Sequence, residues 1–142
     1  MTTSPPAATD ELPEAACWKL LRQAVIGRLA VATDDGPDIF PINFVVDHGS
    51  IVFRTAAGRK FSSSTGQPVA FEVDGYDDGD ATAWSVVVRG RAREIRDTDE
   101  VIEALSLPLF PWHAGPKPRF MRVTAAQVTG RRLHVAGGST RG

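Results

Sequence analysis

The stretch DIFPINFVVDHGSIVFRT, residues 38–55, contains two apolar runs joined by the turn sequence DHGS at residues 47–50. Successive residues of a strand point to opposite faces, so every second residue of the first run shares a face. One face then carries the four apolar side chains Phe40, Ile42, Phe44 and Val46. We predict a β-hairpin whose first strand turns these side chains toward the core.

The other face of the same strand contains two unusual residues, Pro41 and Asn43. Proline has no amide hydrogen to donate, so Pro41 indicates a sheet edge or a point at which strand pairing stops. An asparagine in an apolar strand needs a hydrogen-bond partner if it is buried. Asn43 is therefore either a surface residue near the strand end or a ligand contact beside an interrupted sheet edge.

The segment TAAGRK, residues 55–60, follows the hairpin. Its small residues would let backbone amides approach an anion, Thr55 adds a hydroxyl, and Arg59 and Lys60 bring two cations. It matches neither common phosphate-loop pattern, GxxxxGK[ST] or GxGxxG. Taken alone, the segment is more typical of a glycine turn with a solvated basic pair.

The rest of the chain reads as further strands with two helices. Residues 1–9 are rich in Thr, Ser, Pro and Ala and are expected to be a disordered arm. Asp10 is expected to cap a helix that ends before Gly27, and a second helix is expected at residues 97–106. Strands are predicted at the following ranges and in one or two further stretches near the C-terminus: 28–33, 38–47, 51–55, 69–76 and 83–95.

Hairpin connections and the absence of a βαβ rhythm predict the fold class. It is mostly β: a single domain over residues 10–135, built as a six- to seven-stranded antiparallel barrel with helices at its ends. Residues 136–142 are expected to be a flexible tail. Gly90 and Ala92 in the longest strand suit a bulge or barrel corner.

The outer face of that longest strand carries three arginines, Arg89, Arg91 and Arg93. They form either a substrate or polyanion site or a set of cross-strand ion pairs. Carboxylates at Glu72 and Asp74 favour the second interpretation, because opposite charges on neighbouring strands stabilise a sheet.

Composition excludes several classes of function. A net charge of -1 over 142 residues argues against a nucleic-acid binder. A single cysteine excludes an internal disulfide and a cysteine-rich metal site, and the three histidines lack metal spacing, so a haem ligated by His48, His113 or His134 is only a weak alternative. Because no apolar run is long enough to span a membrane and the N-terminus does not resemble a targeting signal, we expect a cytoplasmic protein with no membrane or metal partner.

The series GRLAVAT, DIFPINFVVDHGSIVFRTAAGRK, PVAFEVDGY and WSVVVRGRARE resembles the FMN-binding split β-barrel family of pyridoxamine 5'-phosphate oxidase-like proteins. The resemblance covers roughly residues 18–133. It implies a homodimer with two FMN sites at the subunit interface, in which a loop after the third strand holds each phosphate. Deazaflavin-binding relatives use the same groove, so an 8-hydroxy-5-deazaflavin cofactor is the alternative.

The resemblance also implies which residues bind the cofactor. Thr55, Arg59 and Lys60 match the phosphate-binding positions, with Arg54 and Gly58 in the same segment. Ile42 and Asn43 match the strand that runs under the flavin, and Trp84 and Ser85 match the strand facing it. The catalytic residues stay unassigned, since no triad, paired acid or metal site appears.

One departure from the family bears on the reaction. True pyridoxamine-phosphate oxidases are similar to longer chains whose C-terminal segment grips the substrate phosphate, and no such segment follows GRRLHVA here. We therefore expect a flavin- or deazaflavin-dependent oxidoreductase that is not a true pyridoxamine-phosphate oxidase. It would transfer hydride between a reduced nicotinamide or deazaflavin donor and a small organic acceptor. The alternative is a non-catalytic protein that binds or stores a flavin or deazaflavin.

Overall fold

The computed structural model describes residues 9–56, 66–109 and 118–135. These residues form seven strands and two helices. Their bounds are β1 Thr9–Glu11, α1 Glu14–Gln23, β2 Ile26–Thr33, β3 Gly36–Asp47, β4 Ser50–Ala56, β5 Pro68–Asp77, β6 Thr82–Glu94, α2 Thr98–Leu105 and β7 Pro118–His134. The predicted tail lies outside the described residues, as does all of the predicted N-terminal arm except Thr9.

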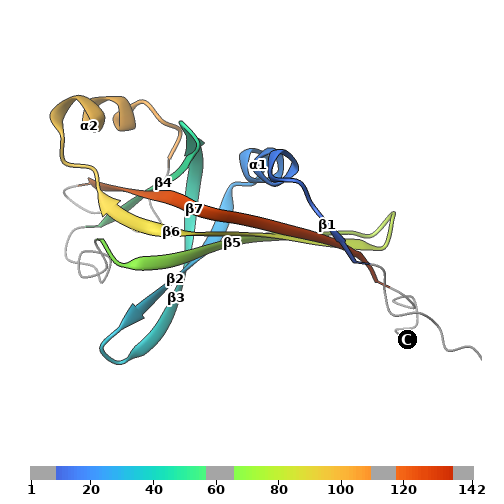
Figure 1. Cartoon of the computed structure of the whole chain (residues 1–142). Helices are drawn as coiled ribbons and strands as arrows, with labels where there is room; N and C mark the ends of the chain where they lie inside the picture. Colours follow the sequence, from blue (N-terminus) through green and yellow to red (C-terminus); the bar gives the residue numbers. More distant parts are fainter. Residues whose placement is uncertain (1–8, 57–65, 110–117, 136–142) are drawn as a thin grey trace, which may run out of the picture.

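The strands form one antiparallel sheet in the order β1-β7-β4-β3-β2-β5-β6. The sheet closes on itself because β7, 17 residues long, pairs with β6 as well as with β4 and β1. Figure 1 shows α2 at one end of the long strands β6 and β7, and β1 at the other. The predicted mostly β, antiparallel split barrel is confirmed.

The main core lies inside the barrel and follows the predicted face of β3. Ile42 and Phe44 are buried, and Phe40 and Val46 pack partly against them. The ring of Phe44 meets the ring of Phe71 edge to face, with 4.7 Å between the ring centroids. Each fully buried side chain of this kind stabilises the fold by about 1.5–3 kcal/mol relative to exposure.

A second, smaller core lies on the other face of β4, against α2. Val52 of β4 alternates with the main-core residues Ile51 and Phe53, and therefore points to this second cluster. Helix α2 begins after Asp97, whose carboxylate accepts a hydrogen bond from the Glu100 amide at 3.2 Å. The predicted second helix is confirmed. The cluster consists of Val52, Ile95, Ala104, Leu109 and Phe120.

The predicted start of the first helix is wrong. Asp10 does not cap a helix but lies in β1, opposite Arg132 of β7. The helix begins at Glu14, after Pro13, whose fixed φ of -61° is compatible with a helix start. Gly27 lies within β2 rather than beyond a helix end, and a Cβ there would come within 2.2 Å of the Phe71 ring. Close packing explains this glycine.

The predicted bulge in the longest strand is confirmed. The register between β6 and β7 shifts between Arg89 and Gly90. A Cβ on Gly90 would lie 1.9 Å from the carbonyl oxygen of Thr124, so only glycine allows the two backbones to approach this closely.

The predicted pairing of the β6 arginines with Glu72 and Asp74 is wrong. Both carboxylates bind Arg28 of β2 instead, at 2.8 Å and 3.0 Å. The register explains the difference, because Glu72 lies opposite Arg28 on β2 but opposite Val87 on β6. Partial burial and the neighbouring Asp74 raise the pKa of Glu72, although Arg28 acts in the opposite direction.

Candidate functional site

The strands β3 and β4 separate at a fork, which is where the barrel splits. Strand β3 pairs with β4 only from Phe44 to Asp47. Before Phe44 it pairs with β2, whereas β4 continues alongside β7 as far as Ala56. Pro41 lies in the part of β3 that the ladder to β4 does not reach, as expected from its missing amide hydrogen. The two strands that start as a hairpin therefore part beyond Phe44 and Phe53.

Four of the predicted cofactor-binding residues flank this fork, two on each strand. Extending the β3–β4 register by one residue would set Asn43 opposite Arg54, and by two residues Ile42 opposite Thr55. Strand alternation divides these four between two faces. Asn43 and Arg54 share the face of the second core, while Ile42 and Thr55 share the face of the main core.

Burial separates the roles that these four side chains can take. Ile42 is only 4% exposed and packs in the main core, so its side chain is not available to a ligand and only its backbone could contact one. Thr55 is buried. Asn43 and Arg54 are half-buried. The polar groups at the fork are therefore an amide, a guanidinium and a hydroxyl.

Arg54 is the most informative residue of the site. Its guanidinium carbon lies 5.9 Å from the centroid of the Phe120 ring, which is a cation–π contact. Its Nε is buried and has no hydrogen-bond partner within the described part of the chain. A buried donor left unsatisfied costs about 1–3 kcal/mol. An anionic group at the fork would remove that penalty, so the site fits a phosphate-bearing ligand.

Three predicted cofactor-binding residues, Gly58, Arg59 and Lys60, lie outside the described residues. Both flanks of this segment are defined. The chain leaves β4 at Ala56 opposite Pro118 of β7, and at Gly66 it donates a hydrogen bond of 2.7 Å from its amide to the carbonyl of Ala92. The segment therefore begins and ends at the same end of the barrel as the fork.

Trp84 and Ser85 are not brought to the fork within one chain. They lie opposite Arg132 and Arg131 of β7, whereas Thr55 lies opposite Arg119. A separation of twelve to thirteen residues corresponds to roughly 40 Å along a strand. Trp84 also packs against the main core and covers Gly75, where a Cβ would come within 2.8 Å of the indole. Its side chain thus has a packing role.

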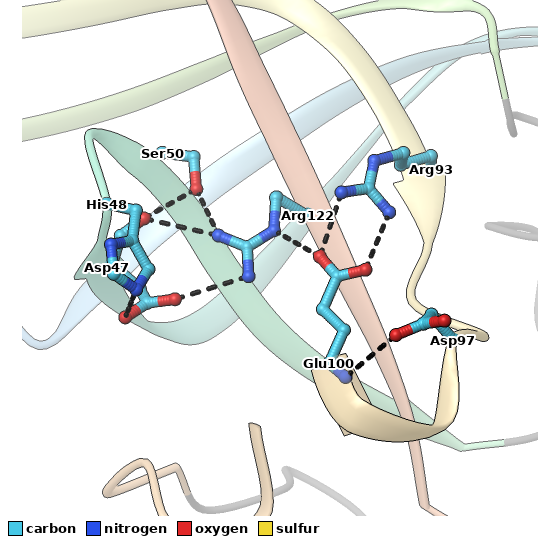
Figure 2. Close-up of polar contacts among 7 residues, drawn as sticks. All are labelled: Asp47, His48, Ser50, Arg93, Asp97, Glu100 and Arg122. Carbon is cyan, nitrogen blue, oxygen red and sulfur yellow. Dashed lines mark hydrogen bonds and ion pairs between the residues drawn. The ribbon is translucent and has the colours of Figure 1, made fainter. Parts of the chain in front are cut away.

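A polar cluster joins the tip of the β3–β4 hairpin to α2 (Figure 2). Arg122 of β7 donates from Nε to Glu100 at 3.0 Å and from a second nitrogen to Ser50 at 2.6 Å. Its third nitrogen pairs with Asp47 at 3.2 Å. Arg93 donates to both carboxylate oxygens of Glu100, at 2.8 Å to the oxygen that Arg122 also binds and at 3.2 Å to the other. These hydrogen bonds lower the pKa of that carboxyl, with a further contribution from Arg122.

Sequence reasoning missed both Phe120 and Arg122. Phe120 supports Arg54 from the strand beyond β4, and Arg122 connects three elements. Neither residue belongs to a recognisable motif, and Arg122 is 22 residues from Glu100 in the sequence. The alternation of residues 118–124 would have identified their faces but not their partners.

Neither a metal centre nor a haem site is supported by the described residues. No group of three His, Cys, Asp or Glu side chains within them is placed to hold a metal ion. His48 lies at the exposed β3–β4 turn, and His134 lies opposite Thr82 at the far end of β6. His113 is outside the described residues. In the same part of the chain, neither helix is long and apolar enough to cross a bilayer.

Comparison with known proteins supports the resemblance found in the sequence. The family described as pyridoxamine 5'-phosphate oxidase matches residues 13–132. The chain belongs to this family. The match runs from the residue before α1 to the third-last residue of β7. It therefore includes both strands of the fork and the segment between β4 and β5.

Individual proteins also match this chain over most of their length. The uncharacterized protein Rv0080 of Mycobacterium tuberculosis is 32% identical over 138 residues, covering 92% of this chain and 90% of that protein. The structure of the FAD binding protein from Mycobacterium smegmatis is 41% identical, with a TM-score of 0.79, and covers 89% of this chain and 99% of that one. The protein of unknown function DIP1874 from Corynebacterium diphtheriae is 36% identical, with a TM-score of 0.76 and coverages of 88% and 98%.

Proposed function

We propose that this protein binds a flavin at the fork of β3 and β4 and acts as a flavin-dependent oxidoreductase on a small organic molecule. The observation that carries the proposal is the buried Nε of Arg54, which lacks a partner in the described residues. Arg54 and Asn43 are the first residues beyond the end of the β3–β4 ladder on the two strands. Membership of the pyridoxamine 5'-phosphate oxidase family and similarity to an FAD binding protein support a flavin as the ligand.

The residues of the chain would hold and orient this cofactor. Arg54, with Arg59 and Lys60, would bind its phosphate, and Thr55 would add a hydroxyl donor. Asn43 would donate from its amide toward the pyrimidine edge of the ring system. A bound flavin supplies the hydride-transfer chemistry itself, while the protein provides binding, orientation and exclusion of water.

The cofactor is proposed to be FMN, with an 8-hydroxy-5-deazaflavin as the alternative. FAD has to be tested beside them, because the Mycobacterium smegmatis relative is an FAD binding protein. FMN and FAD both carry the anionic phosphate chemistry that Arg54 requires. The proposed donor is a reduced nicotinamide or deazaflavin, and the proposed acceptor is a small organic molecule.

We further propose that the site is completed in a homodimer. Trp84 and Ser85 lie roughly 40 Å from Thr55 along β7. One flavin is too short to contact both groups within a single chain. If Ser85 approaches the cofactor, as the family resemblance implies, it must come from a second copy whose β6 lies against the fork.

Absorbance of the purified protein tests the cofactor proposal. A bound flavin gives two bands, a deazaflavin gives one band at shorter wavelength, and mass spectrometry of the released ligand separates FMN from FAD. Anaerobic bleaching by a reduced nicotinamide or deazaflavin would support an oxidoreductase; a bound flavin that neither donor reduces would favour the binding or storage role. A colourless protein that takes up none of the three cofactors would contradict the proposal.

Substitutions of the basic residues test where the phosphate of the proposed flavin binds. The double variant Arg59→Ala/Lys60→Ala and the single variant Arg54→Ala should each lower flavin affinity about tenfold or more, because a charge-assisted hydrogen bond contributes roughly 1.5–3 kcal/mol. Arg22→Ala, at the exposed end of α1, is the control and should bind flavin normally. Unchanged affinity in both test variants, with an unchanged melting temperature, would place the phosphate elsewhere.

A further inference from the structure

Four side chains on one face of β4 and β7 connect the fork to α2. In the ladder between these strands, Phe120 lies directly opposite Arg54, and Arg122 lies directly opposite Val52. Because side chains alternate along each strand, all four point to the face of the second core and away from the main core. The group therefore extends from Arg54 at the fork to Arg122, which binds α2.

The ring of Phe120 is held from the side of α2. It is only 4% exposed and packs in the second core together with Ala104 of α2 and Ile95, the first residue after β6. The Ile95 amide donates a hydrogen bond of 2.8 Å to the carbonyl of Phe120. Two residues along β7, Arg122 donates to Glu100 of α2 at 3.0 Å (Figure 2). Docking of α2 therefore limits the positions that the Phe120 ring can take.

The same ring supports Arg54. The guanidinium carbon of Arg54 lies 5.9 Å from the ring centroid of Phe120, within reach of a cation–π contact. A free arginine side chain has many rotamers, and a ligand that had to order it would bind more weakly for that reason. A side chain that already lies over a fixed ring is partly ordered before the ligand arrives.

From these contacts we infer that Phe120 is a positioning residue for Arg54, and that α2, by holding Phe120, sets the affinity of the fork for the flavin phosphate. This role rests on the proposed flavin site and adds a means of regulating it, because loosening of α2 would weaken flavin binding from a distance. Coupling between two sites is reciprocal, so bound flavin should in turn stabilise the docking of α2.

FMN and riboflavin, which differ only in the phosphate, test the role of Phe120. Each is titrated into the full chain after removal of any bound cofactor. Phe120→Leu keeps an apolar side chain but removes the aromatic face, so it should weaken FMN binding about threefold or more. Riboflavin binding should not change, because Arg54 is proposed to contact the phosphate. Phe120→Tyr, which keeps the aromatic face, should bind FMN like the unmodified protein.

Two comparisons separate positioning from a loss of stability. Phe71→Leu removes a ring that is equally buried but lies in the main core, so it should lower stability and leave the FMN affinity of the folded protein unchanged. Phe120→Leu added to Arg54→Ala should cause no further loss of FMN affinity, because its effect passes through Arg54.

Arg122→Met tests the contribution of α2. It removes the contact to Glu100 without changing the fork, and should weaken FMN binding about twofold or more. Arg96→Met, at an exposed position, is the control and should bind FMN normally. In the unmodified protein, FMN should slow amide hydrogen exchange in α2, and this protection should be smaller in Phe120→Leu.

A measurement without flavin distinguishes failure of this role from failure of the flavin site. The NMR signal of the Arg54 Nε–H group should be shifted by the Phe120 ring, and should move toward the position of solvated arginines in Phe120→Leu and in Arg122→Met. An unmoved signal in either variant, or equal weakening of FMN and riboflavin, would overturn the inference. An unmodified protein that binds no FMN, with signals that do move, would contradict the flavin site but not the positioning of Arg54.

Discussion

Gly90 lets β6 and β7 approach more closely than any side chain would permit. A Cβ there would meet the backbone oxygen of Thr124 at 1.9 Å, and backbone moves less readily than a side chain. We expect Gly90→Ala to lower the free energy of unfolding by about 1–3 kcal/mol through strain in a packed region. Thermal and denaturant unfolding measure the change.

Gly79→Ala is the matched control for this substitution. Gly79 lies in the exposed loop between β5 and β6, where a Cβ would touch only a side-chain oxygen of Asp77 at 3.3 Å. Its cost should stay within about 0.5 kcal/mol, as for most surface substitutions. Equal stability of the two variants would show that the β6–β7 backbones separate easily at the bulge.

Two glutamates should respond to pH in opposite directions. The pKa of Glu100 is lowered by Arg93, so ionised Glu100 adds stability that is present above its ordinary pKa and is lost as pH falls through the lowered value. The pKa of Glu72 is raised by partial burial and by Asp74. Its contribution to stability is complete below the ordinary glutamate pKa and is lost as pH rises through the raised value.

The measurement compares Glu100→Gln and Glu72→Gln with the unmodified protein between about pH 3 and pH 7, around the ordinary glutamate pKa of about 4.3. The stability of Glu100→Gln relative to the unmodified protein should fall as pH rises, and that of Glu72→Gln should increase. Parallel pH profiles for the two variants would contradict the assigned environments. The experiment also separates the Arg28 pair from the Arg93 pair, although the two pairs have the same length of 2.8 Å.

At the scale of elements, Arg122 fastens α2 to the β3–β4 hairpin. Its side chain is 12% exposed and binds Asp47, Ser50 and Glu100. Arg122→Met should lower stability by about 1–3 kcal/mol, because the partly buried Asp47 carboxylate loses its arginine and Glu100 keeps only Arg93. Hydrogen exchange should accelerate first in α2, the element that this contact fixes.

Arg96→Met tests whether the burial of an arginine, rather than the mere presence of an ion pair, decides its contribution to stability. Arg96 also pairs with a glutamate, Glu94 at 3.2 Å, but its side chain is 77% exposed. Exposed pairs contribute about 0–1 kcal/mol, so this variant should behave almost like the unmodified protein. If both substitutions had the same effect, the cluster in Figure 2 would be a surface feature without a role in holding α2.

At the scale of the whole molecule, the proposed homodimer predicts complementation between two defective variants. Arg54→Ala removes the fork side of the site, and Ser85→Trp obstructs the β6 side. Each variant alone should bind flavin at least about tenfold more weakly than the unmodified protein. Co-refolded together, they should recover about a quarter of the sites, because half of the random dimers are mixed and each mixed dimer has one intact site.

Two controls accompany the complementation. Size-exclusion chromatography should show both variants at the mass of a dimer. A mixture of Arg54→Ala with the double variant Arg59→Ala/Lys60→Ala changes the same side of the site twice and should recover no binding. Recovery in that mixture, or none in the first, would mean that the flavin site lies within a single chain.

Much of the fold follows from the sequence, because period-two patterns and turn residues are local signals. The β3 face, the turn at residues 47–50 and the Asp97 cap are of this kind. The sequence predicts the first helix to start too early, because β1 is held by its pairing with β7. Local sequence does not reveal that pairing. The partners of Glu72 depend in the same way on which strand lies beside β5.

The sequence predicts which positions belong to the candidate site, but it does not predict how those residues are arranged in space. Asn43 on β3 and Arg54 and Thr55 on β4 flank the fork, just beyond the last β3–β4 pair. Strand alternation could have separated Arg54 from Thr55, but the role of Phe120 beneath Arg54 depends on the β4–β7 register. The distance of Ser85 from the fork depends on the length and pairing of β7, which residue types alone do not reveal.

The role of β7 as the closing strand has a consequence for how the chain folds. This last strand supplies partners to β1, β4 and β6, and its contact between Thr9 and Leu133 links residues 124 positions apart. Local hairpins can form while the ribosome is still adding residues, but the barrel has no complete seam until β7 has emerged. Native contacts of such long sequence separation slow folding. The nascent protein therefore passes through an open sheet whose exposed edges await the final strand.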